Sequence, residues 1–409
     1  MKVSFRVAGV IAGLVGALTL AMAAPVAATP GISLSVGSTS VAHPISGGRT
    51  IYVATNGSDT VQSWNRYNCL NDPSYLASKT SSQTTCPEPT IAAPLATVQL
   101  AVRIAKPGDV IVVRAGVYRE AVGWSARRGT ASAPIILQSY PGERVEINGT
   151  LILRSPDYWT IRGIHFTYNK AIQKTGQAIV AIAGGQHWIF ANNEVSGSTG
   201  VANLLVQSDT AASSSTAAKT AAAPQNYDIT SNCIHTNNGT GTQGTDHNIY
   251  LMSSIYSAGG TIDHNFLAGA PRGSNIKAAA SSASTGSDSP RNVLIDYNTM
   301  LYAASGVVVG LQAEHVSIEH NLIALPSGAQ SNDGGVKTYQ VGAPGTNAVK
   351  DSLIYGYASP VHEDWGVKAH IFTARNVNTP VSFTGSVNNC TVKPTSSTVM
   401  NQYGQYAGQ

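Results

Sequence analysis

Short stretches of alternating apolar and polar residues recur along the chain. In each, an asparagine follows the alternating residues, and a further apolar residue stands two positions after the asparagine. The frame is apolar–x–apolar–x–x–Asn–x–apolar, with glycine once in the first position. It occurs at residues 188–195, 227–234, 260–267, 293–300 and 316–323, and an earlier copy at 159–166 has Ile164 in place of the asparagine. A period of two places one face of a short strand inward, so the frame predicts two strands joined by a fixed bend.

The separations between the asparagines indicate a coiled repeat. They are 39, 33, 33 and 23 residues, so one coil takes a little over twenty residues and the excess forms loops, such as 208–225 and 281–290. Asparagine tolerates the left-handed backbone of a bend, and stacked copies about 4.8 Å apart can form a ladder of amides. A stack of coils buries a core that one coil cannot. A β-sandwich would not repeat the same bend residue, so we predict an all-β, single-stranded parallel β-helix.

The segment before these coils predicts one helix. Apolar residues at Leu95, Val98, Val102 and Ala105 follow helical spacing over residues 94–105, and Pro107 with the next glycine ends the pattern. Strands are expected at 50–54 and 109–114. We expect this helix to cap the N-terminal end of the solenoid.

The chain begins with the pattern of a bacterial-type signal peptide. Lys2 and Arg6 precede an apolar run at 7–21 and a small-residue cleavage pattern at 21–23. A membrane helix is the alternative, but the run is shorter than the ~20 residues that a span needs. We therefore expect a secreted protein divided into a signal peptide (1–28), a linker (29–48), a β-helix domain (49–375) and a C-terminal strand with a loose tail (376–409).

Composition and charge narrow the class of protein. Charged residues make up 11% of the chain, against about 25% in average proteins, which suits a secreted all-β protein. A net charge of +4 is too small to indicate nucleic acid and is compatible with an acidic ligand. Cys69 and Cys86 lie in a polar stretch and predict a local disulfide, whereas Cys233 and Cys390 could pair or could be buried separately.

Several segments resemble a known superfamily. They are YVATNGS at 52–58, PLATVQLA at 94–101, PGDVIVV at 107–113 and GVYRE at 116–120, followed by the asparagine-bearing coils. Over about residues 50–370 the chain resembles secreted right-handed parallel β-helix proteins of the pectate lyase superfamily, especially the lysine-base pectate lyases and the chondroitinase B and alginate lyase group. The resemblance implies a right-handed helix and an acidic polysaccharide as partner. We expect a monomer, with no nucleic acid and no membrane partner after signal cleavage.

A second strand precedes each asparagine frame and carries the candidate chemistry. If Ile249, Ile276, Val308 and Val336 point inward, their neighbours Tyr250, Lys277, Val309 and Lys337 point outward. The stack then places Tyr250 beside Lys277, with His247 nearby. A lysine of lowered pKa can remove the C5 proton of a uronic acid sugar. Residues 275–278 are similar to the strand that carries the base in the lysine-base pectate lyases, so Lys277 is the predicted base.

The remaining candidates complete a β-elimination site. Tyr250 or His247 would protonate the leaving oxygen, and Arg272 or Lys337 would neutralise the substrate carboxylate. Asn203, Asn248 and Lys337 would bind substrate. Each of these residues could instead be an ordinary surface or turn residue.

Carboxylates offer a weaker set of alternatives. Asp246 stands where the lysine-base pectate lyases carry an acidic calcium cluster, and Asp263, Asp296 and Glu319 share one frame position. These residues could hold Ca²⁺, or the column could be a polar edge neutralised by neighbours such as His264. Asp246 with Asp263 could also act as the acid and base of a hydrolase. A non-catalytic carbohydrate-binding or structural β-helix stays open, because the fold alone fixes no function.

Overall fold

The computed structural model describes residues 48–61, 64–71, 86–123, 126–211, 213–239, 246–282, 287–325, 334–343, 345–363 and 371–407, all within one compact unit, Val36–Gln409. The expected signal peptide lies outside the described residues, as does the expected linker apart from Gly48. Among the described helices, none has the length and apolar character that a membrane span requires.

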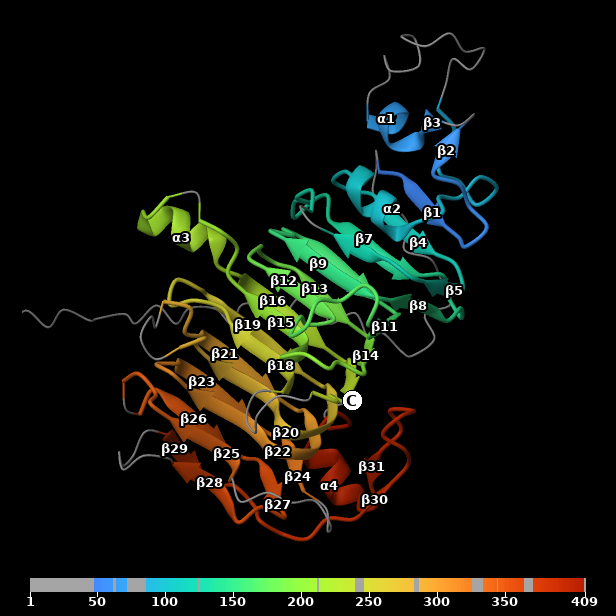
Figure 1. Cartoon of the computed structure of the whole chain (residues 1–409). Helices are drawn as coiled ribbons and strands as arrows, with labels where there is room; N and C mark the ends of the chain where they lie inside the picture. Colours follow the sequence, from blue (N-terminus) through green and yellow to red (C-terminus); the bar gives the residue numbers. More distant parts are fainter. Residues whose placement is uncertain are drawn as a thin grey trace, which may run out of the picture. The chain divides into compact units, whose positions relative to one another are not determined.

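Parallel strands stack in three rows, and successive coils add strands to each row in chain order (Figure 1). The first row is an 11-stranded sheet, and the other two rows join into a 16-stranded sheet because β20 and β22 run through the bend between them. The first row comprises β1 (Thr50–Val53), β4 (Val110–Val113), β7 (Ile135–Ser139), β10 (Trp159–Arg162), β13 (Ile189–Ala191), β16 (Gln225–Thr230), β19 (Gly259–Asp263), β21 (Arg291–Asp296), β23 (Glu314–Glu319), β26 (Asn347–Lys350) and β29 (Ile371–Ala374).

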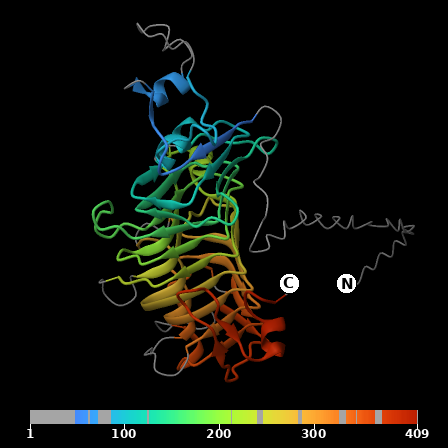
Figure 2. The ribbon, with the colours of Figure 1, turned by 90° about the vertical axis from the view of Figure 1, so that its right-hand side faces the viewer.

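The second row comprises β5 (Gly116–Tyr118), β8 (Val145–Asn148), β11 (Ile164–Thr167), β14 (Glu194–Ser196), β17 (Cys233–His235), the first parts of β20 (Phe266–Ala279) and β22 (Thr299–Gly310), β24 (Leu322–Ala324) and β27 (Leu353–Tyr355). The third row comprises β6 (Ala121–Gly123), β9 (Thr150–Arg154), β12 (Val180–Ala183), β15 (Ala202–Gln207), β18 (His247–Met252), the last parts of β20 and β22, β25 (Gly334–Tyr339) and β28 (Ser359–Glu363). The predicted parallel β-helix is therefore confirmed, and Figure 2 shows its coils stacked in chain order.

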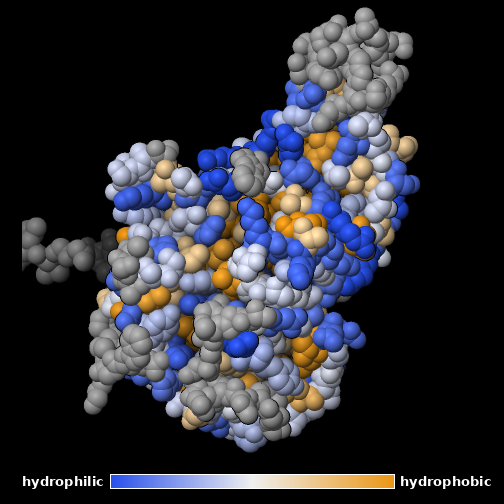
Figure 3. All heavy atoms as spheres, viewed as in Figure 1, coloured by the Kyte–Doolittle hydropathy of each residue, from blue (hydrophilic) through white to orange (hydrophobic). Residues whose placement is uncertain are grey.

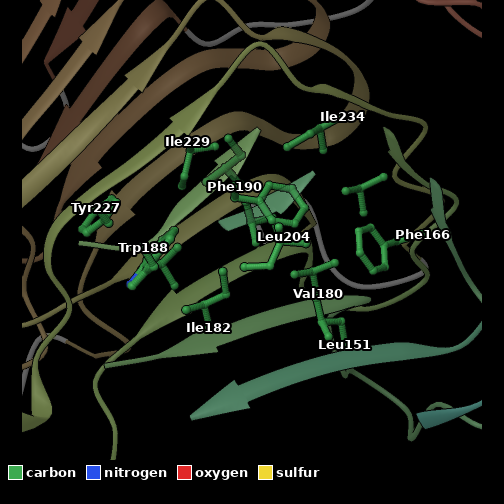
Figure 4. Packing of buried hydrophobic residues seen from close by; sticks show 14 of the residues in the cluster. Leu151, Phe166, Val180, Ile182, Trp188, Phe190, Leu204, Tyr227, Ile229 and Ile234 are labelled. Carbon is green, nitrogen blue, oxygen red and sulfur yellow. The ribbon is translucent and has the colours of Figure 1, made fainter. Parts of the chain in front are cut away.

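The repeat frame sets the register between coils. Ile229, Ile262, Ile295 and Ile318 pair one to the next along the first row, and all four are fully buried. Aromatic residues fill the wider part of the core, where the labelled side chains of Figure 4 meet between the rows. Trp188 stacks on Tyr227 with ring centroids 4.8 Å apart. Alternation along each strand thus becomes a continuous apolar interior.

The asparagines form the predicted ladder, but they do not supply the left-handed residue. Asn265 Nδ2 donates to Asn298 Oδ1 at 2.9 Å, and the amide of Asn232 donates to Asn265 Oδ1 at 2.9 Å. The residue before each asparagine has positive φ instead, as at His264 (52°) and Tyr297 (50°). The bend therefore needs two residues: one takes the strained backbone conformation, and the asparagine satisfies the backbone groups that the bend exposes.

The helix near the N-terminus is shorter than predicted. It is α2 (Val98–Ile104), and the Thr97 hydroxyl caps it by accepting from the Leu100 N–H at 3.1 Å. Leu95 lies outside it and forms a parallel bridge with Val53. The buried face of α2 joins the main core and packs against β1, β4 and β6.

Three short helices and two hairpins lie outside the rows. They are α1 (Arg66–Asn71), α3 (Thr216–Ala222) and α4 (Ser397–Gln402), the hairpin of β2 (Thr60–Val61) with β3 (Trp64–Asn65), and the hairpin of β30 (Phe383–Thr384) with β31 (Lys393–Pro394).

The C-terminal segment packs against the solenoid over its described residues, 371–407. Val381 and Val392 pack with Phe266, Leu322 and other apolar residues on the outer face of the second row. The Gly404 N–H donates to the His320 carbonyl at 2.9 Å. The Cys233–Cys390 disulfide ties the segment to β17, so these two cysteines pair with each other, and the predicted Cys69–Cys86 disulfide is confirmed.

Candidate functional site

The third row carries one outward column that contains the predicted base. Register pairs Leu205 with Tyr250, Tyr250 with Lys277, Lys277 with Val308, and Val308 with Lys337. Lys337 pairs in turn with His362. The predicted adjacency of Tyr250 and Lys277 is therefore present. Val308 faces outward rather than inward, because Ile276 pairs with Val307 and not with Val308.

Lys277 is half-buried and has an aromatic neighbour, but no acidic neighbour among the described residues. Its Nζ lies 4.7 Å from the centre of the Tyr250 ring. Within the described part of the chain, no carboxylate oxygen lies within 4.0 Å of it. Burial lowers the pKa of the Lys277 ammonium below its ordinary value. The tyrosine ring attracts the ammonium and opposes this shift, so the loss of hydration is the larger effect.

Tyr250 is more buried than the sequence indicated. Its side chain is 8% exposed, and its hydroxyl donates to the Ala280 carbonyl at 3.1 Å. Ala178, Ala202, Leu205 and Met252 pack around it. Burial raises the pKa of the phenol, which keeps it protonated. The hydroxyl is therefore engaged by the backbone, and the ring forms an apolar support for Lys277.

Two other predicted catalytic residues, His247 and Arg272, differ sharply in exposure. His247 is 1% exposed, because it shares the strand face of the inward Ile249. Its Nδ1 accepts from the Ser274 backbone N–H at 3.1 Å, which fixes the neutral tautomer with the proton on Nε2. Arg272 is exposed at the register shift between Ala270 and Ser274. No hydrogen bond or ion pair joins Arg272 to the other described residues.

Asn203 and Asn248 lie inside the fold, which contradicts their predicted contact with substrate. Asn203 Nδ2 donates to Asn248 Oδ1 at 2.8 Å, and Asn248 Nδ2 donates to Asn275 Oδ1 at 2.7 Å. All three side chains are fully buried. They form a second ladder, at the bend before the third row. The sequence signal was an asparagine recurring in successive coils, which is also the signal of the first ladder.

The carboxylates predicted as metal ligands do not form one site. Asp263, Asp296 and Glu319 pair along the first row, as expected, but each contacts a histidine or lysine side chain. Asp263 Oδ2 lies 3.1 Å from His264 Nδ1, Asp296 Oδ1 lies 2.9 Å from His320 Nδ1, and Glu319 Oε1 lies 3.1 Å from Lys350 Nζ. The column therefore fits a neutralised polar edge.

Asp246 lies apart from that column. It is 4% exposed and immediately precedes β18, in the third row. A side chain at Gly239 would meet its carboxylate at 2.1 Å, so it sits closely packed against the preceding loop. Asp246 thus lies on a different row from Asp263 and Asp296.

Another cluster with ligand-type atoms comprises Cys233, His235 and Cys390. The disulfide consumes both thiols, so this cluster does not offer thiolate ligands. His235 and His165 each lie 3.2–3.3 Å from Glu194 Oε1, with Arg144 on the other carboxylate oxygen. This polar cluster lies on the second row, away from Lys277.

Sequence reasoning missed Tyr339 and Gly310. Gly310 pairs with Ala279 on one side and with Tyr339 on the other. A Cβ at Gly310 would lie 2.5 Å from Tyr339 Cε1, so the tyrosine ring leans across the glycine toward the coil of Lys277. The signal that could have identified them is a glycine at an outward strand position, because glycine is needed there when a neighbouring group approaches the backbone closely.

Elsewhere on the visible face, apolar patches lie among hydrophilic residues (Figure 3).

The chain is a parallel β-helix protein that resembles pectate and alginate lyases. No family model matches it. It is 32% identical to the pectate lyase PEL9 of Emericella nidulans over 107 residues, 26% of this chain and 24% of the relative. The match thus spans about a quarter of the length of that curated relative.

Two solved structures have a backbone path similar to that of this chain. The pectate lyase Pel9A has a TM-score of 0.48 and 13% identity, with coverage of 82% of this chain and 79% of Pel9A. An alginate lyase from Paenibacillus sp. str. FPU-7 has a TM-score of 0.36 and 15% identity, covering 69% and 92%. The fold is established by the strand order of this chain itself.

Proposed function

We propose that the protein is a polysaccharide lyase that cleaves a uronic-acid-containing polysaccharide by β-elimination, with Lys277 as the base. The observation that carries the proposal is the environment of the Lys277 amine. It combines partial burial, an aromatic support from Tyr250 and a lowered pKa, with no acidic partner among the described residues.

The reaction requires a neutral base and stabilisation of negative charge. Lys277 Nζ takes the C5 proton, the C5–H electron pair forms the C4–C5 double bond, and the bond from C4 to the glycosidic oxygen breaks. Loss of hydration favours the neutral amine and so prepares Lys277 for this step. Charge that develops on the substrate carboxylate needs nearby donors. We propose Lys337 and His362 for this task, because they continue the outward column two and three strands beyond Lys277.

Calcium is not required by this proposal. The carboxylates predicted as ligands lie on two different rows, and those of the first row already contact histidine or lysine. We therefore expect a chelator to leave activity unchanged. A loss of activity that added Ca²⁺ restores would overturn this part of the proposal while leaving Lys277 as base.

The test compares wild type with Lys277→Ala and Lys277→Arg on pectate, alginate and glycosaminoglycans. The unsaturated product of elimination absorbs in the ultraviolet, so product formation is followed directly. We expect absorbance to rise with wild type on one polymer and to be lost in both variants, since arginine keeps the charge but is not deprotonated. Lys106→Ala is the matched control, because Lys106 is exposed and lies far from Lys277 in the sequence. New reducing ends without absorbance would indicate a hydrolase, and binding without product a carbohydrate-binding protein.

We further propose that the protein acts outside the cell and that α2 caps the N-terminal end of the core. Two disulfides among the described residues are typical of an oxidising compartment. The buried face of α2 lies against the first strands of the first and third rows. The signal peptide, the domain limits and the monomeric state remain parts of the same proposal.

A further inference from the structure

Elimination leaves one chemical role unfilled in the site described above. The departing sugar oxygen needs a proton, and the two groups predicted for that role are committed elsewhere. The Tyr250 hydroxyl donates to the Ala280 carbonyl, and His247 is buried with Nδ1 bound to the Ser274 N–H. A proton donor must instead be sought among the other side chains on the outer face of the third row.

The column next to Lys277 contains an unusual pair of positions. Ala279, Gly310 and Tyr339 follow one another in register on the outward side of β20, β22 and β25. Ala279 and Gly310 are buried although their strand positions face outward. The ring of Tyr339 accounts for the burial of Gly310, because its Cε1 lies 2.5 Å from where a Cβ would stand. The missing side chain lets the ring tilt toward Ala279, two residues beyond Lys277.

The separation between Lys277 and Tyr339 allows both side chains to contact one substrate. Tyr339 is two strands and two residues from Lys277, about 10 Å across the sheet and about 7 Å along it. The tilt over Gly310 shortens the first of these separations, and both side chains are long. Burial raises the pKa of Tyr250, and the phenol of Tyr339 adds to this shift. Lys277 and Tyr339 thus lie on either side of the buried positions Ala279 and Gly310.

We propose that Tyr339 is the catalytic acid that protonates the leaving oxygen, an inference that rests on the proposed lyase function. As Lys277 Nζ takes the C5 proton, the electron pair of the breaking C4–O bond passes to the glycosidic oxygen. That oxygen takes the proton of the Tyr339 hydroxyl, which becomes a phenolate. The phenolate regains a proton from the Lys277 ammonium by way of water, and both groups return to their starting state.

The protonation state of Tyr339 is consistent with this role. Burial raises the pKa of its phenol, while the nearby Lys337 ammonium lowers it, and the net shift is upward. Tyr339 is therefore neutral around neutral pH and can donate. The sugar oxygen that receives the proton is far more basic than a phenolate, so the transfer is downhill.

The test uses Tyr339→Phe with Tyr297→Phe as the matched control, because the Tyr297 ring stacks on His264 and His320 at a bend of the first ladder. Both variants remove one hydroxyl and keep a ring. We expect Tyr339→Phe to lower kcat by about 10²–10⁴-fold, the usual contribution of a positioned acid, with KM within about threefold of wild type. Tyr297→Phe should keep kcat within about threefold, since its ring stacks on two histidines outside the column of Lys277. A kcat for Tyr339→Phe within threefold of wild type overturns the proposal.

Gly310→Ala supplies a second variant that leaves the Tyr339 hydroxyl in place. Gly310 has an ordinary φ, so alanine adds no backbone strain, but its methyl group must push the tyrosine ring aside. We expect kcat to fall at least tenfold while thermal stability changes little. Full activity of Gly310→Ala overturns the proposal if Tyr339→Phe does not fold. If Lys277→Ala still forms unsaturated product, the proposed lyase mechanism is wrong. If Lys277→Ala is inactive and Tyr339→Phe is active, the lyase mechanism stands and only the role of Tyr339 is wrong.

Discussion

Replacing Asn265 with alanine tests whether the asparagine ladder holds the coils together. Asn265 is fully buried and lies at the centre of the ladder. Its Oδ1 accepts from the Asn232 backbone N–H at 2.9 Å, and its Nδ2 donates to the Ile229 carbonyl at 2.8 Å. Its own backbone N–H donates to Asn298 Oδ1 at 3.0 Å, a bond that alanine keeps.

The magnitude follows from the groups that lose a partner. The Asn232 N–H and the Ile229 carbonyl each lose a bond in a dry interior, at about 1–3 kcal/mol for each group. The free energy of unfolding of Asn265→Ala should therefore fall by about 2–6 kcal/mol. Aspartate in place of Asn265 should do no better, because it keeps the acceptor but buries a charge.

The assay is urea unfolding followed by circular dichroism. Asn238→Ala is the matched control, since Asn238 is exposed and its side chain has no hydrogen bond among the described residues. The control should stay within about 0.5 kcal/mol of wild type. A similarly small change for Asn265→Ala would show that the ladder contributes nothing to stability and that packing alone sets the coil register.

Three further perturbations probe other parts of the fold. Replacing Cys233 and Cys390 together with serine should lower stability by about 2–5 kcal/mol, and limited proteolysis should then cut first between residues 381 and 407. The pKa of His264 is raised chiefly by its hydrogen bond to Asp263, so its contribution to stability is complete below pH 6.5 and is lost as pH rises through the raised folded value. The melting temperature of wild type should thus exceed that of His264→Gln below pH 6.5, and the difference should shrink well above it; a constant difference would contradict the assignment. Val102→Glu places an unpaired charge on the buried face of α2 and should destabilise the protein by several kcal/mol, with hydrogen exchange accelerating first in β1 and β4 if α2 is the cap.

The coil frame was predictable because its physics is local. Alternation and one recurring asparagine fix the inward face of each strand, and Ile229, Ile262 and Ile295 pair as the frame requires. The frame did not predict the last steps of the ladder, where residues outside the frame accept the same hydrogen bonds from the backbone. Ser352 and Asn376 continue the ladder, as Asn321 N–H donates to Ser352 Oγ at 3.1 Å and Ser352 N–H to Asn376 Oδ1 at 3.1 Å.

The site was predicted less completely than the fold, for two reasons. A strand without an anchoring asparagine can slip by one residue in an alignment, which reversed the faces assigned to Val308 and Val309. An asparagine in an outward strand position was taken for a ligand-binding group, whereas Asn203 and Asn248 satisfy each other inside a bend. The path of the C-terminal segment depends on contacts between residues far apart in sequence, such as Val392 with Phe266, and no local pattern encodes them.

The central claim is that Lys277 acts as a neutral base, and the pH dependence of kcat/KM tests it most directly. A lysine base is active only when deprotonated, so kcat/KM should rise with pH through a pKa below 10.5, the ordinary value for lysine. Lys277→Ala should lack this rise and should form no unsaturated product. A wild-type profile without the rise, or product formation by Lys277→Ala, would contradict the account.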